Sequence, residues 1–166
     1  MVGHWRGRYA FAITDWARFR ATPMPLADRM RVLAMHLVAR CIGSFAMRTS
    51  VTASRIDEGY VEHTTAASKW AMPLFSSRET LRLGPEGRSL TMRGPQRLWP
   101  LFWPPRDFGE ATGEIDDEAA GALYRIPWLG GEMVQRTRVV AGGLELSQEA
   151  PWFRASVLLR RVSPSA

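Results

Sequence analysis

The chain has 166 residues, of which 46% are hydrophobic and 23% are charged. These values are close to the average of globular proteins and exclude an intrinsically disordered chain. The length favours one domain, which we place at residues 1–162, followed by a short tail at 163–166. The most apolar stretch, residues 32–47, is shorter than the roughly 20 residues of a membrane-spanning helix and contains His36 and Arg40, so we expect no transmembrane helix.

The net charge is +6, which raises the question of a nucleic-acid partner. The basic residues are dispersed: Lys69 is the only lysine, and the longest run of arginines is Arg160-Arg161. Arginines at alternating strand positions cover the outer face of a sheet with their apolar stems. Because such a pattern does not form a phosphate-binding track, the sequence predicts no nucleic-acid partner.

Cys41 is the single cysteine of the chain, which excludes an intramolecular disulfide and a cysteine-based zinc site. The opening residues, 1–6, lack the order of basic, apolar and small residues of a signal peptide and lead directly into an expected strand. We therefore expect a cytoplasmic protein.

The first expected elements are a strand and a helical insertion. Residues 4–14 have a period of two, which predicts a half-buried strand. Asp15 is a suitable N-cap for a short helical turn, and a longer helix is expected at about residues 26–41. On that helix we expect a polar stripe and a broad apolar face; the stripe comprises Arg29, His36 and Arg40, and the face comprises Leu33, Leu37 and Val38.

After Gly43 the period of two returns, with turn residues at short intervals. The expected strands lie at residues 45–51, 60–66, 78–83, 89–93, 108–115, 120–128, 132–140, 144–149 and 152–162. Residues 98–105 contain three prolines and are expected to form a covering loop or a bulged edge, because proline cannot donate to a central ladder. About ten strands in succession close most simply into an antiparallel up-and-down β-barrel. The fold class is thus mainly β, with a helical insertion after the first strand.

This layout resembles the calycin group, which includes the lipocalins and the fatty-acid-binding proteins. Gly3-His4-Trp5 matches the Gly-x-Trp that opens many lipocalins. A helical lid, here at about residues 15–42, that follows the first strand of a long antiparallel meander is similar to the fatty-acid-binding branch. The resemblance implies a ligand cavity inside the barrel, although a fold alone does not assign a function.

The inward face of the expected barrel carries few polar residues. Gln135 and Thr137 share the Met133 side of their strand and are expected to point inward, as is Gln148 of the next strand. With Tyr124 from the strand before, the two glutamines are placed to hydrogen-bond a carbonyl or hydroxyl group of a ligand. The alternative is that they satisfy each other, because a buried polar group needs a partner.

Two carboxylates, Glu79 and Glu62, share a face with apolar or aromatic neighbours on their strands. A carboxyl group in an apolar environment is a usable general acid or base. The alternative is that each faces water at the barrel mouth or pairs with an arginine such as Arg78 or Arg93. The expected catalytic residues are Glu79, Tyr124, Gln135 and Gln148.

The candidates for ligand contact share the expected inward faces or belong to the aromatic residues. They are Trp5, Tyr9, Phe11, Tyr60, Glu62, Trp70, Leu81, Met133, Thr137 and Leu146. Aromatic side chains dominate cores and ligand pockets alike, so most of the seven tryptophans are expected to serve packing.

The sequence carries no motif for a metal or for covalent catalysis. His4, His36 and His63 contain no close pair, so their spacing predicts no metal site. The chain has no Gly-x-Ser-x-Gly elbow, no Walker loop and no dinucleotide fingerprint, and we expect no cofactor. A haem held by one axial histidine is the alternative.

Two functions of different classes fit these observations. The first, which we favour, is a cofactor-free enzyme that binds a hydrophobic substrate, such as a polyketide or terpenoid, and catalyses its cyclisation or isomerisation by holding it in a reactive shape. The second is a non-catalytic carrier or sensor of an apolar ligand, with the helix at residues 26–41 as a portal lid. A third is an interaction domain with a filled core.

Overall fold

The computed structural model describes residues 2–53, 59–67, 73–98, 106–107, 109–116 and 120–162, with the backbone alone at 42, 53, 59–63, 65–67, 73–74, 98 and 106. The elements are β1 (Gly3–Ile13), α1 (Trp16–Ala21), α2 (Leu26–Ile42), β2 (Phe45–Ala53), β3 (Gly59–Ala67), β4 (Pro73–Leu83), β5 (Ser89–Arg93), β6 (Pro95–Leu98), β7 (Arg106–Asp107), β8 (Ala111–Asp116), β9 (Gly121–Trp128), β10 (Gly131–Val140), β11 (Gly143–Ala150) and β12 (Phe153–Arg161). The chain is mainly β, as predicted.

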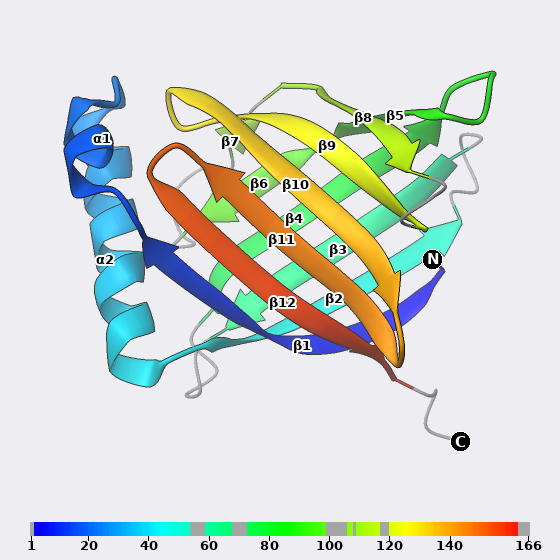
Figure 1. Ribbon diagram of the computed structural model, residues 1–166, viewed down its shortest axis with the longest axis horizontal. Helices are drawn as coiled ribbons and strands as arrows, with labels where there is room; N and C mark the ends of the chain where they lie inside the picture. Colours follow the sequence, from blue (N-terminus) through cyan, green and yellow to red (C-terminus); the bar gives the residue numbers. More distant parts are fainter. Residues whose placement is uncertain are drawn as a thin grey trace.

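Ten of the strands form a curled antiparallel sheet (Figure 1). Neighbours along this sheet are β1, β2, β3, β4, β5, β8, β9, β10, β11 and β12, and β12 pairs with β1. The β3–β4 pairing completes the ring of hydrogen-bonded neighbours. The short strand β6 pairs with part of β4, and β7 pairs with β6. The prediction of about ten antiparallel strands with a helical insertion after the first is confirmed, and the arrangement is consistent with a calycin-like barrel.

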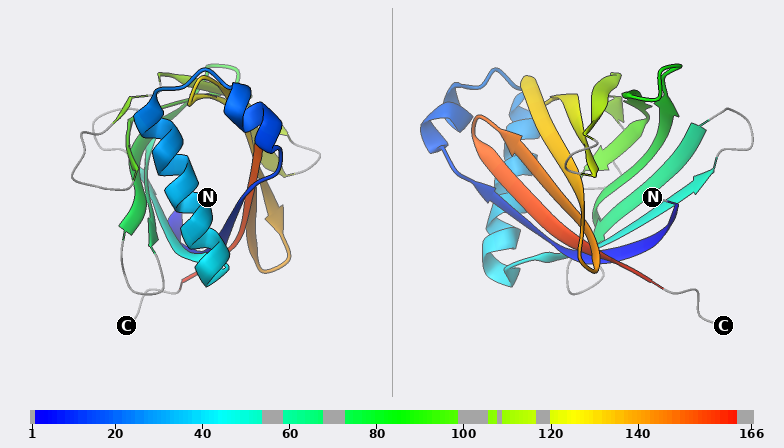
Figure 2. Two further views of the ribbon diagram at one scale, coloured as in Figure 1. Left: turned by 90° about the vertical axis from the view of Figure 1, so that its left-hand side faces the viewer. Right: turned by 45° about the vertical axis from the view of Figure 1, so that its right-hand side comes forward.

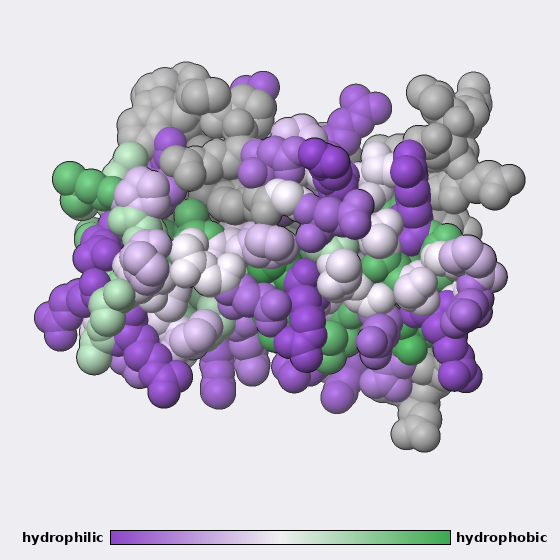
Figure 3. All heavy atoms as spheres, turned by 90° about the horizontal axis from the view of Figure 1, so that it is seen from above, coloured by the Kyte–Doolittle hydropathy of each residue, from purple (hydrophilic) through white to green (hydrophobic). Residues whose placement is uncertain are grey.

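The alternation of side chains gives the sheet an apolar inner face and a polar outer face. In β12 buried and exposed residues alternate from Phe153 to Arg160, as a strand with one face in a core requires. Seen from above, hydrophilic side chains cover most of the described surface (Figure 3). None of the helices in the described ranges is long and apolar enough to cross a membrane.

Helices α1 and α2 lie across one end of the barrel (Figure 2, left). Asp15 caps α1, because its Oδ1 accepts a hydrogen bond from the backbone N–H of Arg18 at 2.9 Å. Buried Phe19 of α1 contacts the ring of Trp152, with 5.1 Å between ring centroids. At the β9–β10 turn, Gly130 has a φ of +82°, and a Cβ there would collide with the carbonyl oxygen of Pro23. The helical insertion is thus packed against the barrel at both the aromatic cluster and this turn.

The expected faces of α2 were wrong at two positions. His36 is only 6% exposed, whereas Leu37 is 61% exposed. The reason is a hydrogen bond that sequence hydropathy does not reveal: the backbone N–H of Ile13, at the end of β1, donates to His36 Nδ1 at 3.2 Å. Because this hydrogen bond satisfies the imidazole, His36 can lie on the buried face of α2, where an apolar residue was expected.

This buried imidazole predicts a loss of stability in mild acid. Burial and the nearby charge of Arg40 lower the pKa of His36, so in the folded protein Nδ1 stays free to accept the hydrogen bond from Ile13. The unfolded chain binds the proton near the ordinary pKa of about 6.5, so the free energy of unfolding should fall as the pH drops below about 6.5. Urea unfolding on both sides of that pH should show a larger loss for the natural protein than for His36→Gln. Equal losses in the two proteins would contradict this prediction.

The boundaries differ from those expected at three strands. β4 begins at Pro73 rather than at residue 78, β8 begins at Ala111 rather than at residue 108, and β6 was not expected. β5 and β6 pair with the same edge of β4 in one register, and Gly94 lies between them, where a Cβ would collide with the carbonyl oxygen of Arg78. This close approach lets residues 95–98 add to β4. Most of the expected loop at 98–105 and the expected tail at 163–166 lie outside the described residues.

Candidate functional site

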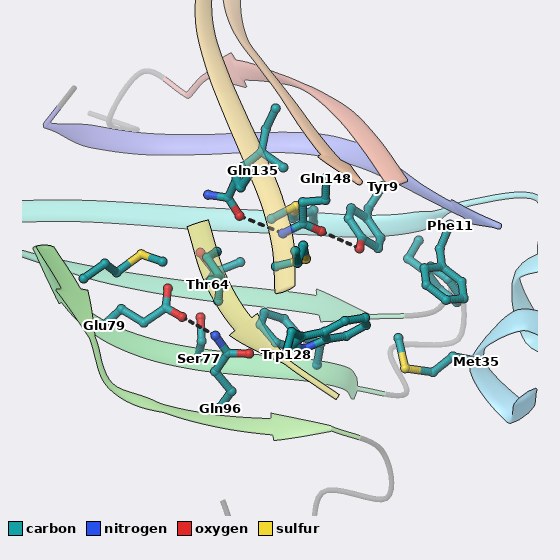
Figure 4. A pocket seen from close by; sticks show the side chains of 17 residues that line it. Tyr9, Phe11, Met35, Thr64, Ser77, Glu79, Gln96, Trp128, Gln135 and Gln148 are labelled. Carbon is teal, nitrogen blue, oxygen red and sulfur yellow. Dashed lines mark hydrogen bonds between the residues drawn. The ribbon is translucent and has the colours of Figure 1, made fainter. Parts of the chain in front are cut away.

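A cavity of about 70 Å³ lies inside the barrel (Figure 4). One buried water occupies roughly 10–15 Å³ of such space, so the cavity has room for a small molecule. Most of the lining is apolar: Phe11, Met35, Phe45, Met47, Phe75, Met92, Ile126, Trp128, Met133 and Leu146. The polar lining residues are Tyr9, Thr64, Ser77, Glu79, Gln96, Gln135 and Gln148.

One wall of the cavity carries a directed chain of hydrogen bonds. Gln135 of β10 and Gln148 of β11 lie opposite each other in register. The Tyr9 hydroxyl donates to Gln148 Oε1 at 2.8 Å, and Gln148 Nε2 donates to Gln135 Oε1 at 2.7 Å. Burial raises the pKa of Tyr9 well above its ordinary value, which keeps the hydroxyl protonated and donating.

The chain of hydrogen bonds ends at the Gln135 amide nitrogen. Gln135 Oε1 is occupied by Gln148, so the Nε2 group of Gln135 is the end that remains. Within the described part of the chain, this Nε2 has no hydrogen-bond acceptor. The wall therefore presents an N–H donor to whatever enters the cavity.

A second polar row crosses β2, β3, β4 and β6. Its members lie opposite one another in register, in the order Thr49, Thr64, Ser77 and Gln96. The hydroxyls of Thr49 and Thr64 are 3.2 Å apart and hydrogen-bonded. Ser77 is 2% exposed, and its Oγ has no hydrogen-bond partner in the described residues.

Glu79 joins this second row from two residues further along β4. It is buried, and its Oε1 accepts a hydrogen bond from Gln96 Nε2 at 2.6 Å. A carboxylate can only accept, so the contact orients the Gln96 amide with its nitrogen toward Glu79. The second wall is therefore rich in acceptors, in contrast to the donor on the first wall.

The two walls face each other across the barrel. Starting at β3, the ring reaches β10 after β4, β5, β8 and β9 in one direction and after β2, β1, β12 and β11 in the other. Both paths take the same number of steps, so the strand of Thr64 and the strand of Gln135 are opposite (Figures 1 and 4). A ligand in the cavity would lie between them.

The structure brings seven of the sequence-predicted residues together around the cavity: Tyr9, Phe11, Glu79, Met133, Gln135, Leu146 and Gln148. The two glutamines hydrogen-bond to each other, but the Gln135 Nε2 group has no acceptor among the described residues. Their roles in binding or catalysis stay predictions.

Four other predicted residues, which the structure describes, do not line the cavity. Leu81, Tyr124 and Thr137 are buried elsewhere in the core, and Trp5 packs partly buried against a second apolar cluster that includes Met47. The Tyr124 ring lies against β8, because a Cβ at Gly113 would be 2.8 Å from its Cδ1. The side chains of Tyr60 and Glu62, and all of Trp70, lie outside the described residues.

Sequence reasoning missed Ser77, Thr64 and Gln96. Ser77 lies two residues before Glu79, so an earlier start of β4 would have placed it on the same inward face. Thr64 shares the parity of Glu62, so the same strand pattern places it on the same face as that candidate. Gln96 lies beyond the expected strand at 89–93, so no strand pattern was assigned to it.

Among the described residues, no group of three or more His, Cys, Asp or Glu side chains gathers to hold a metal ion. The polar groups that the described residues place at the cavity are hydroxyls, amides and one carboxylate. Comparisons of the chain with protein-family models, with curated proteins and with solved structures find no significant match.

Proposed function

We propose that this protein is a calycin-like barrel of the cytoplasm that binds a compact, mostly apolar small molecule in its cavity. The observation that carries the proposal is the Ser77 hydroxyl, which is buried at the cavity wall with no hydrogen-bond partner in the described residues. A buried polar group without a partner costs roughly 1–3 kcal/mol. A ligand that pairs with this hydroxyl offsets that cost.

The rest of the lining supports the same proposal. Aromatic and methionine side chains such as Phe11, Met35 and Trp128 surround the space, and pockets for small molecules are commonly apolar with a few placed polar groups. The Gln135 amide nitrogen adds a second group that lacks a partner within the described chain. Apolar burial would supply affinity, and the two polar groups would orient the ligand.

Native mass spectrometry of freshly purified protein tests this proposal. We expect a small compound to co-purify, to be released on denaturation and to be lost in Ser77→Leu, which fills the cavity. Ser156→Leu is the matched control, because Ser156 is exposed on the outer face of β12 and the compound should stay bound. If no compound co-purifies, indole serves as a small apolar probe in calorimetry, and the same difference between the two variants is expected.

Equal retention of the compound in both variants would contradict binding in the cavity. An empty protein that also fails to bind indole would contradict the proposal as a whole.

The buried Glu79 carboxylate favours a second candidate function, cofactor-free isomerisation or cyclisation of the bound molecule. In an α,β-unsaturated ketone, Glu79 would remove a proton from the carbon beyond the C=C bond, and the electron pair of that C–H bond would form a new C=C bond while the old one shifts and the carbonyl oxygen becomes an enolate oxygen. The Gln135 N–H would stabilise that oxygen. As the carbonyl re-forms, Glu79 would return the proton to the carbon next to it, so that the double bond moves by one position. Gln148 and Tyr9 would hold Gln135 in place through their hydrogen bonds. Such a step needs no oxidant and no cofactor.

Incubation of the released compound with fresh protein tests this second function. If the protein is an enzyme, the compound is converted, and Glu79→Gln should lower the rate by roughly 10²–10⁴-fold, which is the usual contribution of a general acid or base. Glu145→Gln is the matched control, because Glu145 is exposed on β11 and should leave the rate unchanged. A compound that is recovered unaltered would contradict catalysis and leave a carrier or sensor.

A further inference from the structure

We propose that the ligand is two-ended, with a hydrogen-bond acceptor at one end and a donor at the other, and that it is held across the barrel between Gln135 and the cluster of Ser77, Glu79 and Gln96. This inference rests on the proposed binding function and names the class of molecule. It follows from the unequal chemistry of the two opposite walls.

The first wall selects an acceptor on the ligand. The hydrogen bonds run in one direction, from the Tyr9 hydroxyl to Gln148 and from Gln148 to Gln135. Reversal would require Tyr9 to accept from Gln148 and to donate its proton elsewhere, and among the described residues Tyr9 has no other hydrogen-bond partner. The free end of the chain is therefore an amide N–H, and its natural partner is a carbonyl oxygen.

The second wall selects a donor on the ligand. Glu79 is an acceptor, and the bond from Gln96 Nε2 to Glu79 leaves Gln96 Oε1 as a further acceptor. The Ser77 hydroxyl lies opposite Gln96 in register and has no partner in the described residues. A hydroxyl or amine group of a ligand can donate to this cluster and also satisfy Ser77.

The positions of the two walls determine where the acceptor and the donor lie on the ligand. Because β4, the strand of Ser77 and Glu79, is four steps from β10 in one direction around the ring of ten strands and six in the other, the acceptor and the donor must lie on different sides of the molecule. The space between them is lined by apolar side chains such as Met92, Met133 and Leu146. The ligand class is thus a compact ring or short chain with a ketone at one end and a hydroxyl or amine at the other.

Three probes of similar size test this class by isothermal titration calorimetry. 4-Hydroxyacetophenone has the acceptor and the donor, 4-methylacetophenone lacks the donor, and 4-ethylphenol lacks the acceptor. At a pH where the phenols stay protonated, we expect 4-hydroxyacetophenone to bind about two- to tenfold more tightly than each of the others, which is the effect of one net hydrogen bond.

The same three probes are then titrated into variants of each wall, to test which wall determines which preference. Ser77→Ala should reduce the preference for 4-hydroxyacetophenone over 4-methylacetophenone and leave its preference over 4-ethylphenol intact. Gln135→Leu should have the opposite pattern. Ser77→Thr keeps a hydroxyl and should restore the first preference, and Ser156→Ala on the outer face of β12 should change neither.

The outcomes separate this inference from the proposed function. Binding of all three probes with equal affinity would overturn the two-ended ligand while leaving a binding cavity. Variants that lower the affinity for all probes alike would also overturn it, because the walls would then have no selective role. No binding of any probe, together with no binding of indole, would overturn the proposed function itself.

Discussion

Replacement of Phe153 with alanine is expected to lower the free energy of unfolding by about 3–5 kcal/mol, as for other large-to-small changes of core aromatics. Phe153 begins β12, is 1% exposed and lies in the centre of an aromatic cluster. Its ring centroid is 4.7 Å from that of Trp128, 5.0 Å from that of Trp152 and 5.5 Å from that of Phe11.

This cluster joins the helical insertion to the barrel, because Phe19 of α1 contacts Trp152. The loss of the Phe153 ring should therefore leave a cavity that the rigid neighbouring strands close only in part. Urea unfolding followed by tryptophan fluorescence measures the change. Leu158→Ala on the same strand is the control, since Leu158 is 45% exposed and its loss should change stability by less than about 0.5 kcal/mol. Similar effects of the two variants would contradict the assignment of Phe153 to the core.

Replacement of Asp28 with alanine is expected to have an effect of similar size for an electrostatic reason. Asp28 is 0% exposed in the first turn of α2, and its Oδ1 is 2.6 Å from Arg31 Nη1. Removal of one partner of a buried ion pair leaves a charge in a low-dielectric environment, which destabilises proteins by about 3–5 kcal/mol. We expect chemical unfolding to show a loss in that range.

A double variant separates the charge effect from simple loss of packing. Asp28→Leu with Arg31→Met replaces the pair by apolar side chains, and it should recover part of the stability lost in Asp28→Ala, because both residues also make contacts outside this pair. The exposed pair of Arg125 and Glu132, at 3.0 Å, is the matched control, and Glu132→Ala should cost only about 0–1 kcal/mol. A double variant as unstable as Asp28→Ala would contradict the electrostatic explanation.

Much of the fold was predictable because the strand period is a local property. The alternation at residues 4–14 and 132–140 places every second side chain on one face, whatever the strand pairs with. The expectation of about ten antiparallel strands was thereby confirmed. The boundaries near residues 73 and 95 were not predictable, because those segments become strands through pairing with β3 and β4 rather than through their own pattern.

The candidate site was predictable only in part, for the same reason. Gln135, Gln148 and Glu79 could be placed on inward faces from their own strands, and the structure puts all three at the cavity. Tyr124 was expected beside them, and it does pair in register with Gln135, but its ring lies against Gly113. The alternation along a strand predicts which face of the sheet a side chain is on, whereas the rotamer of that side chain depends on the neighbouring strand.

The sequence by itself determined the mainly β class, the helical insertion after the first strand and the inward parity of Gln135 and Glu79. Each of these depends on residues a few positions apart, whose geometry the backbone sets. Only the tertiary structure decided that Ser77 lies opposite Gln96, that β3 lies across the ring from β10 and that His36 is buried against Ile13. These relations join segments far apart in the chain, and they depend on strand register and helix docking, which no local pattern encodes.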